Sequence, residues 1–176
     1  MKPFLSTVAC ALLGLAGTPA LAEEASAEMH SVSAEGIGES MGTVQLSDGD
    51  GGLTLAVDVQ GLTPGEHGFH LHQNGSCEPA ANAEGQMTAA LSAGGHYDPD
   101  ETGTHAGPEG DGHKGDLPVL EVGSDGMATA ELTAPRLTVA DARGKALVIH
   151  AGGDNYSDEP AALGGGGARV ACGIVQ

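Results

Sequence analysis

The clearest pattern of apolar and polar residues is the strict alternation in Leu53-Thr54-Leu55-Ala56-Val57-Asp58-Val59. Successive side chains of a β-strand point to opposite faces, so this segment predicts a half-buried strand. Residues 127–134 alternate in the same way, and residues 146–150 form a short apolar run. Shorter or less regular strand candidates are residues 29–34, 41–46, 67–73, 117–122 and 168–175.

The connections between these candidates are rich in glycine, which makes up 30 of the 176 residues. Residues 48–52, 61–65 and 124–126 have the composition of turns. Residues 74–115 show no periodicity, and no segment predicts a long helix. About eight strands and one long irregular segment predict an all-β sandwich or barrel whose long loop is functional.

A histidine pair lies in one of the strand candidates, at His70-Leu71-His72. Residues i and i+2 of a strand share a face, so both imidazoles can meet one metal ion while Leu71 enters the core. Such a pair is more often incidental than a metal site when it stands alone. What strengthens the metal interpretation is the supply of further ligand types downstream, at His96, His105, His113, Asp116 and His150.

The charge and the N-terminus limit the class of protein. With 24 acidic and 6 basic residues, the formal charge is −18, which argues against binding to nucleic acid or to anionic membranes. Residues 1–22 have the pattern of a secretory signal, with Lys2 first, an apolar run at residues 4–17, and Ala20-Leu21-Ala22 before a cleavage point at Glu23. We therefore expect an exported protein whose single domain is residues 23–176.

Two cysteines remain after the signal, since Cys10 is discarded with it. An even pair in an exported protein favours a disulfide between Cys77 and Cys172, with a thiolate metal ligand as the alternative. The bridge would close a loop of roughly 100 residues, for which the chain-entropy estimate is about 4.7 kcal/mol.

Four spaced motifs stand in the part of the chain from about Val32 to the C-terminus. They are His67-Gly68-Phe69-His70-Leu71-His72, Gly94-Gly95-His96-Tyr97-Asp98-Pro99, Gly112-His113-Lys114-Gly115-Asp116-Leu117 and Ala168-Arg169-Val170-Ala171-Cys172-Gly173. With these motifs the sequence resembles the copper,zinc superoxide dismutases, and among them the bacterial, periplasmic subgroup. The resemblance implies a periplasmic protein with an eight-stranded Greek-key β-barrel, related to immunoglobulin-like sandwiches, and long metal-binding loops.

The resemblance further implies an enzyme that converts superoxide to oxygen and hydrogen peroxide, using a redox-cycling copper and a structural zinc, one of each per chain. A tetragonal set of imidazoles suits copper, and a closed set of three imidazoles and one carboxylate suits zinc. His96 would be shared between the two ions. The positions that match the copper ligands are His70, His72, His96 and His150, and those that match the zinc ligands are His96, His105, His113 and Asp116.

Two further positions match residues with roles in the family. Asp154 would accept hydrogen bonds from the outer nitrogens of His70 and His105 and so fix their tautomers. Arg169 would lie beside the copper, where it attracts and orients the superoxide anion; with His96, which exchanges a proton, it forms the catalytic pair.

The other candidates have weaker roles. His67 matches a position that braces the backbone, and Tyr97 is expected to pack beside the zinc loop. His30, next to Met29, is a candidate for copper capture, although an isolated pair of this kind is usually part of an edge strand.

The segment between Cys77 and His96 is longer than in the eukaryotic relatives and contains no Lys or Arg. Charge steering by this loop is therefore not expected, and attraction of superoxide would depend on the metals, Arg169 and Lys114. The surface sequence is compatible with a monomer or a homodimer. Two other functions remain open, a non-catalytic metal-delivery module on the same barrel and a purely structural β-sandwich; the second leaves the ligand set unexplained.

Overall fold

The computed structural model describes residues 23–176, so the predicted secretory signal lies outside the described residues. Short antiparallel strands dominate, and the helices are single turns: α1 (Val139–Ala142) and the 3₁₀ helices η1 (Leu91–Ala93) and η2 (Leu163–Gly165). The strands are β1 (Glu24–Ser33), β2 (Gly36–Gly49), β3 (Gly52–Gln60), β4 (Gly65–His67), β5 (Phe69–His72), β6 (Ala80–Ala81), β7 (Met87–Thr88), β8 (Leu120–Val122), β9 (Met127–Ala134), β10 (Ala146–His150) and β11 (Arg169–Ile174).

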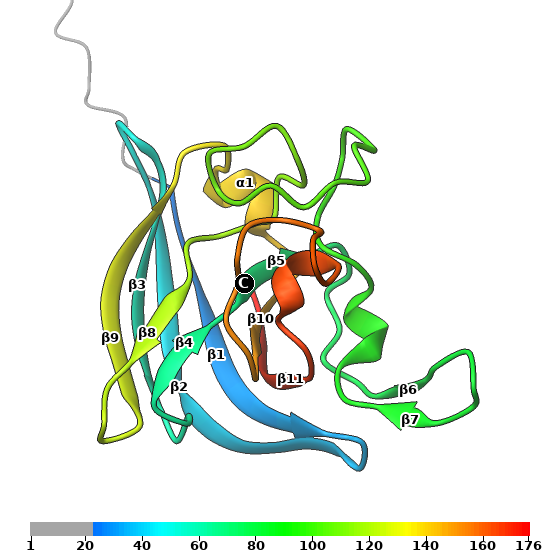
Figure 1. Cartoon of the computed structure of the whole chain (residues 1–176). Coiled ribbons are helices and arrows are strands. Elements are labelled where there is room, and N and C mark those ends of the chain that lie inside the picture. The colour runs from blue at the N-terminus through cyan, green and yellow to red at the C-terminus, as the bar shows by residue number, and fades with distance from the viewer. Residues whose placement is uncertain (1–22) are drawn as a thin grey trace, which may run out of the picture.

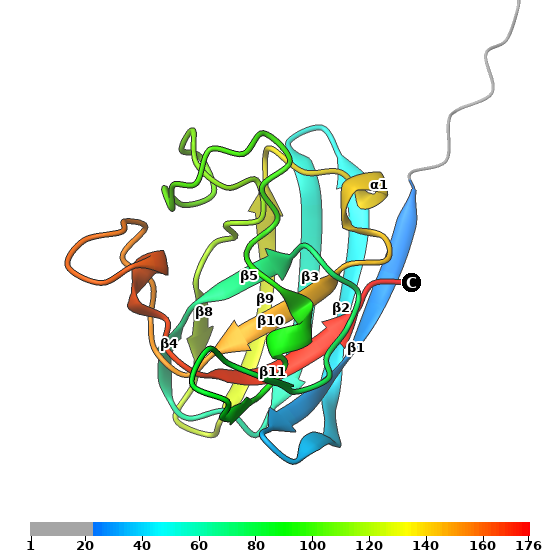
Figure 2. The ribbon, with the colours of Figure 1, turned by 90° about the vertical axis from the view of Figure 1, so that its right-hand side faces the viewer.

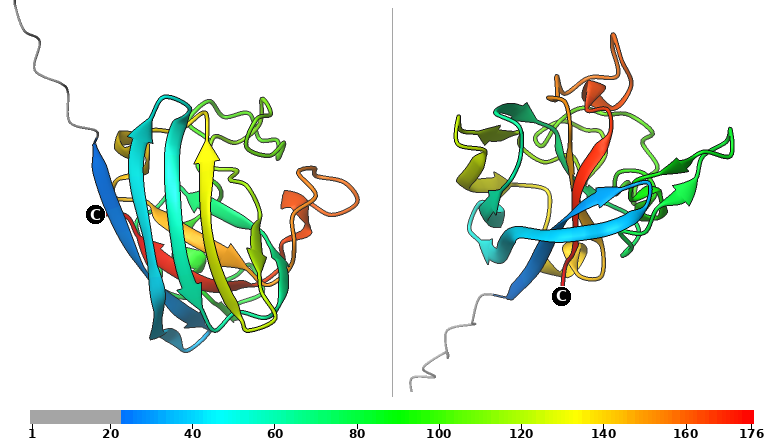
Figure 3. Two further views of the ribbon diagram at one scale, coloured as in Figure 1. Left: turned by 90° about the vertical axis from the view of Figure 1, so that its left-hand side faces the viewer. Right: turned by 90° about the horizontal axis from the view of Figure 1, so that it is seen from below.

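Seven strands form one curled antiparallel sheet in the order β5-β10-β11-β1-β2-β3-β9 (Figures 1 and 3). A second pair, β4 and β8, joins the two ends of this sheet, because β8 leads through a tight turn into β9 and β4 leads directly into β5. The predicted eight-stranded Greek-key barrel is confirmed when β4 and β5 are counted as one interrupted strand.

The prediction of a single continuous strand over residues 67–73 is wrong, because the strand is broken at Gly68. The Gly68 N–H donates to the carbonyl oxygen of Gly152 at 2.8 Å, and its carbonyl accepts from the His150 N–H at 2.8 Å. Before this point the chain pairs with β8, and after it with β10. The strand thus changes its partner at Gly68, two residues before the first ligand candidate, His70.

The first two strands are longer than their sequence pattern suggests. β1 begins five residues before the predicted start at Met29, and its inward positions there are Ala25 and Ala27. Alanine alternating with serine and glutamate gives a weak apolar signal, which explains why these residues were not predicted as a strand.

The core lies inside the barrel and is built from aliphatic side chains together with Met29, Met41 and Phe69. The alternation at residues 53–59 is confirmed, since Leu53, Leu55, Val57 and Val59 are all buried. Leu71 also lies in this core. Figure 2 shows the two long loops, residues 73–119 and 151–168, on the side of the barrel where β5 and β10 run. Among the described residues, no helix has the length and apolar character needed to cross a membrane.

Candidate metal centre

Nearly all buried ionisable side chains of the described residues gather in two adjoining clusters outside β5 and β10. The exception is His67, which is buried but belongs to neither cluster. The other buried members are the seven predicted metal ligands and Asp154, namely His70, His72, His96, His105, His113, Asp116, His150 and Asp154.

The first cluster consists of four imidazoles. His70 and His72 project from β5, His150 ends the neighbouring β10, and His96 comes from the long loop, where it forms an isolated bridge with His72. One ring nitrogen from each of the four lies within 4.8 Å of the others.

The second cluster shares His96 with the first. It adds His105, His113 and Asp116, again with ligand atoms within 4.8 Å of one another. The His96 Nδ1 lies 2.9 Å from the Oδ1 of Asp116, and the His113 Nδ1 lies 3.3 Å from the same oxygen. His96 therefore presents one ring nitrogen to each cluster.

Three backbone hydrogen bonds hold the ligand-bearing segments together. The Leu71 N–H donates to Gly115, the Gly115 N–H to Tyr97, and the Tyr97 N–H to Leu71, at 2.9, 2.8 and 2.8 Å. Gly115 is required here, because an added Cβ would lie 2.2 Å from the carbonyl oxygen of Leu71. These three hydrogen bonds join Leu71, Tyr97 and Gly115 in a closed triangle. They hold the three ligand-bearing segments side by side, although the segments are far apart in sequence.

Asp154 joins the two clusters from behind. One of its carboxylate oxygens accepts from the His70 Nε2 at 2.7 Å and the other accepts from the His105 Nε2 at 2.7 Å. Since both Nε2 atoms must carry hydrogen to make these bonds, each Nδ1 keeps a lone pair for a cation when the ring is neutral.

Backbone carbonyls orient the other two rings of the first cluster. The His72 Nδ1 donates to Gly94 at 2.9 Å and the His150 Nδ1 donates to Gly167 at 3.2 Å. Their Nε2 atoms then carry lone pairs that face each other at 3.4 Å, an arrangement that favours a cation between them.

The residues fit a pair of metal ions by the chemistry of their donors. Four buried ring nitrogens have no hydrogen-bond partner within the described residues: His70 Nδ1, His96 Nε2, His105 Nδ1 and His113 Nδ1. Buried polar atoms without partners are rare in native proteins, and all four of these point into the two clusters.

Burial keeps the imidazoles of the first cluster neutral. It lowers the pKa of His96 to about 4 and the pKa of His150 to about 3. Burial, reinforced by the Arg169 charge, also holds the pKa of His72 well below its usual range. These lone pairs are available to a cation at neutral pH without loss of a proton.

The second cluster behaves differently because it contains carboxylates. Burial alone would lower the pKa of His105, but the carboxylates of Asp116, 3.0 Å from its Nδ1, and of Asp154, 2.7 Å from its Nε2, outweigh burial and raise this pKa to about 9. Burial would raise the pKa of Asp116, yet the neighbouring rings of His105 and His96 hold this pKa below its usual range. A cation that enters this cluster must therefore displace a proton from His105.

Arg169 borders the first cluster. It donates to the carbonyl oxygens of Ala90 and Gly94, both at 2.6 Å, and the Gly94 carbonyl is the one that also accepts from His72. Burial lowers the pKa of Arg169, but a guanidinium keeps its charge at neutral pH. The guanidinium of Arg169 and the ring of His72 therefore lie next to each other, because both donate to the same carbonyl oxygen, that of Gly94.

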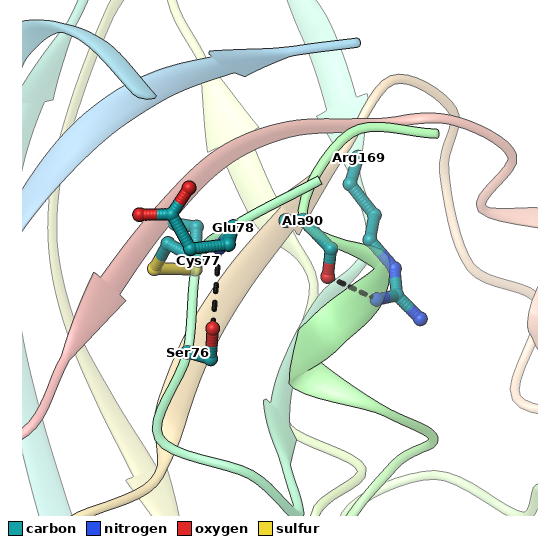
Figure 4. The surroundings of a disulfide bond; sticks show 6 residues. Ser76, Cys77, Glu78, Ala90 and Arg169 are labelled. Carbon is teal, nitrogen blue, oxygen red and sulfur yellow. Dashed lines mark hydrogen bonds between the residues drawn. A yellow bond between two sulfur atoms is a disulfide. The ribbon is translucent and has the colours of Figure 1, made fainter. Parts of the chain in front are cut away.

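A disulfide between Cys77 and Cys172 anchors the loop that holds Arg169 (Figure 4). The alternative of a thiolate metal ligand is therefore wrong. Figure 4 shows Arg169 and its acceptor Ala90 beside the bridge, on the same side of β11. Disulfides of this kind are typical of exported proteins.

The remaining candidates lie outside the clusters. Both ring nitrogens of His67 contact backbone carbonyls, of His150 at 2.6 Å and of Thr63 at 2.8 Å, which is the arrangement of a backbone brace. The Tyr97 ring packs against the core and under Lys145. Met29 is fully buried, so it offers no thioether beside His30.

Lys114 does not stand free as a source of attraction for an anion. Its ammonium group lies 3.2 Å from both carboxylate oxygens of Asp141 in α1. This pair compensates the charge that was expected to help attract the substrate.

Gly164 is a site residue that the sequence did not reveal. A Cβ at this position would lie 1.9 Å from the Oδ1 of Asp154 and 2.9 Å from the Nε2 of His105. Only a residue without a side chain lets the carboxylate reach both imidazoles. A run of four glycines gave no indication of which one matters.

We expect Gly164→Ala to weaken binding of a divalent cation about tenfold or more relative to Gly165→Ala. Gly165 is a matched control, because both residues have positive φ (69° and 77°) while a Cβ at Gly165 meets only Ala161, at 3.8 Å. Both alanines bear the backbone cost, and only the first displaces Asp154. Competition with a chromophoric chelator measures the difference, and equal affinities would contradict the steric role.

Comparison with known proteins places this geometry in a family. A sequence model described as copper/zinc superoxide dismutase matches residues 40–175. This chain belongs to the copper/zinc superoxide dismutase family. It is similar to superoxide dismutase (Cu-Zn) 2 of Salmonella typhimurium, with 53% identity over 173 residues and 98% of each chain covered.

Solved copper/zinc superoxide dismutases share the fold. The enzyme from Brucella abortus superimposes with a TM-score of 0.85 at 48% identity, covering 88% of this chain and all (100%) of that one. The solution structure of the monomeric copper, zinc superoxide dismutase from Salmonella enterica gives a TM-score of 0.78 at 54% identity, with the same coverage of 88% and 100%.

Proposed function

We propose that this chain is a superoxide dismutase, which converts two superoxide anions and two protons into oxygen and hydrogen peroxide. Copper and zinc are its cofactors. The observation that carries the proposal is the sharing of His96, whose two ring nitrogens serve two adjoining sets of buried lone pairs.

We assign one ion to each cluster from the chemistry of its donors. Four imidazoles without a carboxylate suit copper, and three imidazoles with one carboxylate suit zinc. Copper is assigned to His70, His72, His96 and His150, and zinc to His96, His105, His113 and Asp116. Asp154 holds the rings of His70 and His105 in the tautomer that binds.

Copper supplies the one-electron redox chemistry of the reaction, and zinc has none. The chain supplies the rest. Arg169 binds and orients the anion next to His72. Within residues 23–176 the His96 Nε2 has no hydrogen-bond partner, so when it does not hold copper it is free to carry a proton and give it to the peroxide that forms, while Asp116, 2.9 Å from Nδ1, orients the ring.

Metal content and activity test the proposal together. The purified protein should contain one copper and one zinc per chain, and chelation should abolish dismutation until both metals are restored. Bound metal without dismutation would instead favour the rival function, a metal-delivery module on the same barrel. The complete ligand set and Arg169 favour the enzyme.

We expect Arg169→Gln to slow dismutation by roughly tenfold and to change its response to salt. In a chain with net charge −18, Arg169 supplies local attraction, which added salt screens, while the rest of the molecule repels the substrate. The variant's rate should therefore stay flat or rise with ionic strength. Arg143→Gln is the control, because it removes the same charge from an exposed pair with Glu23. An unchanged rate and salt slope in Arg169→Gln would refute the role.

Zinc affinity should rise with pH by up to about tenfold per unit between pH 7 and 9 and then level off. The reason is that the raised pKa of His105, about 9, keeps this ring protonated at neutral pH in the metal-free chain, and zinc must displace that proton. Calorimetric titration of zinc in buffers of different ionisation enthalpy should find about one proton released per ion at pH 7. No proton release there would contradict this.

The secretory signal at residues 1–22 and a periplasmic location are part of the proposal. The disulfide supports export. Glu23, the proposed first residue after cleavage, is already tied into the barrel, because its carbonyl accepts from the Asp48 N–H at 3.1 Å and its carboxylate pairs with Arg143. N-terminal sequencing of the exported protein tests the cleavage point. A homodimer stays a prediction, which sedimentation velocity distinguishes from a monomer.

A further inference from the structure

We propose that Arg136 is a positioning residue for the zinc site, through the backbone of the loop that carries His113. The inference rests on the proposed function, since it needs zinc to be held by the second cluster. Arg136 lies between the end of β9 and the start of α1, far in sequence from every ligand. Within residues 23–176 its hydrogen bonds go to backbone carbonyls and to no ligand side chain, so it acts through the shape of the loop.

The guanidinium of Arg136 donates to three carbonyl oxygens of this loop. Nη1 donates to Gly110 and, at 3.3 Å, to His113, and Nη2 donates to Gly112 at 2.8 Å. The carbonyls of Gly112 and His113 belong to the two peptide planes on either side of the His113 Cα. Fixing both planes fixes the direction in which the His113 side chain leaves the backbone.

His113 is the ligand that most needs this support. Its side chain is 10% exposed, whereas the other three ligands of the second cluster are at most 1% exposed. The loop before it has no regular secondary structure and contains Gly107, Gly110 and Gly112. Apart from Arg136, this loop is held by hydrogen bonds from the His113 N–H to Thr104 at 2.9 Å, from the Ala106 N–H to Asp116 at 3.1 Å and from the His105 N–H to Asp158 at 2.9 Å.

The positive charge of Arg136 allows a positioning role to be distinguished from an electrostatic one, because the two roles predict opposite changes in zinc affinity. Within the described residues it forms no salt bridge, in contrast to Lys114 and Arg143. An uncompensated cation near the second cluster repels zinc, so a purely electrostatic role predicts tighter zinc binding once the charge is removed. A positioning role predicts the opposite, because three loop carbonyls lose their donor.

The test measures zinc release from the copper- and zinc-loaded protein to a chromophoric chelator, with copper content followed in parallel. We expect Arg136→Gln to release zinc about tenfold faster while it retains copper. The rate of zinc release from Arg136→Lys should lie between those of the parent protein and Arg136→Gln, because one ammonium group cannot reproduce the hydrogen bonds of a planar guanidinium to three carbonyls. Arg143→Gln, which loses an arginine elsewhere on the barrel, should match the parent protein.

Unchanged or slower zinc release in Arg136→Gln would overturn the inference and leave the proposed function intact. So would equal acceleration of zinc and copper release, because that would mark general destabilisation. If Arg136→Gln does not fold, Arg136→Lys decides, and zinc release at the parent rate counts against the proposal. A parent protein without zinc in the second cluster would overturn both the inference and the proposed function.

Discussion

Replacing both cysteines, Cys77→Ala with Cys172→Ala, is expected to lower the free energy of unfolding by about 2 to 5 kcal/mol. The bridge joins residues 95 positions apart, so its removal frees most of the unfolded chain. Both positions are buried, and alanine leaves no unpaired polar atom there. Urea unfolding of the metal-free protein, followed by far-ultraviolet circular dichroism, measures the difference.

Reduction of the parent protein is the control, because it breaks the disulfide without substituting any residue. The reduced parent and the double variant should lose similar stability. A loss below about 1 kcal/mol in both would show that the closed loop contributes little, contrary to the chain-entropy argument. A large loss in the variant alone would point to packing around Cys172.

Asp154→Asn is expected to weaken metal binding by about 10- to 100-fold. An amide offers one acceptor and one donor group, so it can accept from only one of the two imidazoles that the carboxylate serves. The other ring keeps a buried N–H without a partner, which costs about 1 to 3 kcal/mol. Chelator competition, carried out separately for copper and for zinc, measures the loss.

Asp50→Asn provides the matched control, because Asp50 lies exposed in the turn between β2 and β3. It removes the same charge at a distance from both clusters. Metal affinities of Asp154→Asn equal to those of Asp50→Asn would show that the bridging carboxylate does not orient the rings. Loss of only one metal would identify which imidazole depends on it more.

The sequence predicted the barrel and the identity of the clustered side chains, because both depend on side-chain type. Alternation at residues 53–59 and 127–134 marked the strands, and the period of two placed His70 and His72 on one face. The two clusters bring together the residues that the family motifs indicated.

The sequence could not reveal the contributions of backbone groups. Carbonyl oxygens of Gly94 and Gly167 set the tautomers of His72 and His150, and no residue type signals them. The break at Gly68 was missed because it depends on which strand lies alongside. Gly164 and Arg136 were missed for the same reason, since their roles arise only from close approach in the folded chain.

Electrostatic attraction of the substrate rests on fewer groups than the sequence suggested. Lys114 is compensated by Asp141, and Arg143 pairs with Glu23. Lys145 lies 4.5 Å over the Tyr97 ring, and Arg136 holds loop carbonyls. Arg169 is thus the basic residue of the described chain that borders the first cluster, and it must act against a strongly acidic surface.

The arrangement of six imidazoles and one carboxylate around two ions is tested most directly by anomalous X-ray diffraction from crystals of the metal-loaded protein. Data collected on either side of the copper and zinc absorption edges should place one copper beside the Nε2 of His96 and one zinc beside its Nδ1, in every chain. A single metal position, or a His96 ring in contact with only one ion, would contradict the shared-ligand site and with it the redox function.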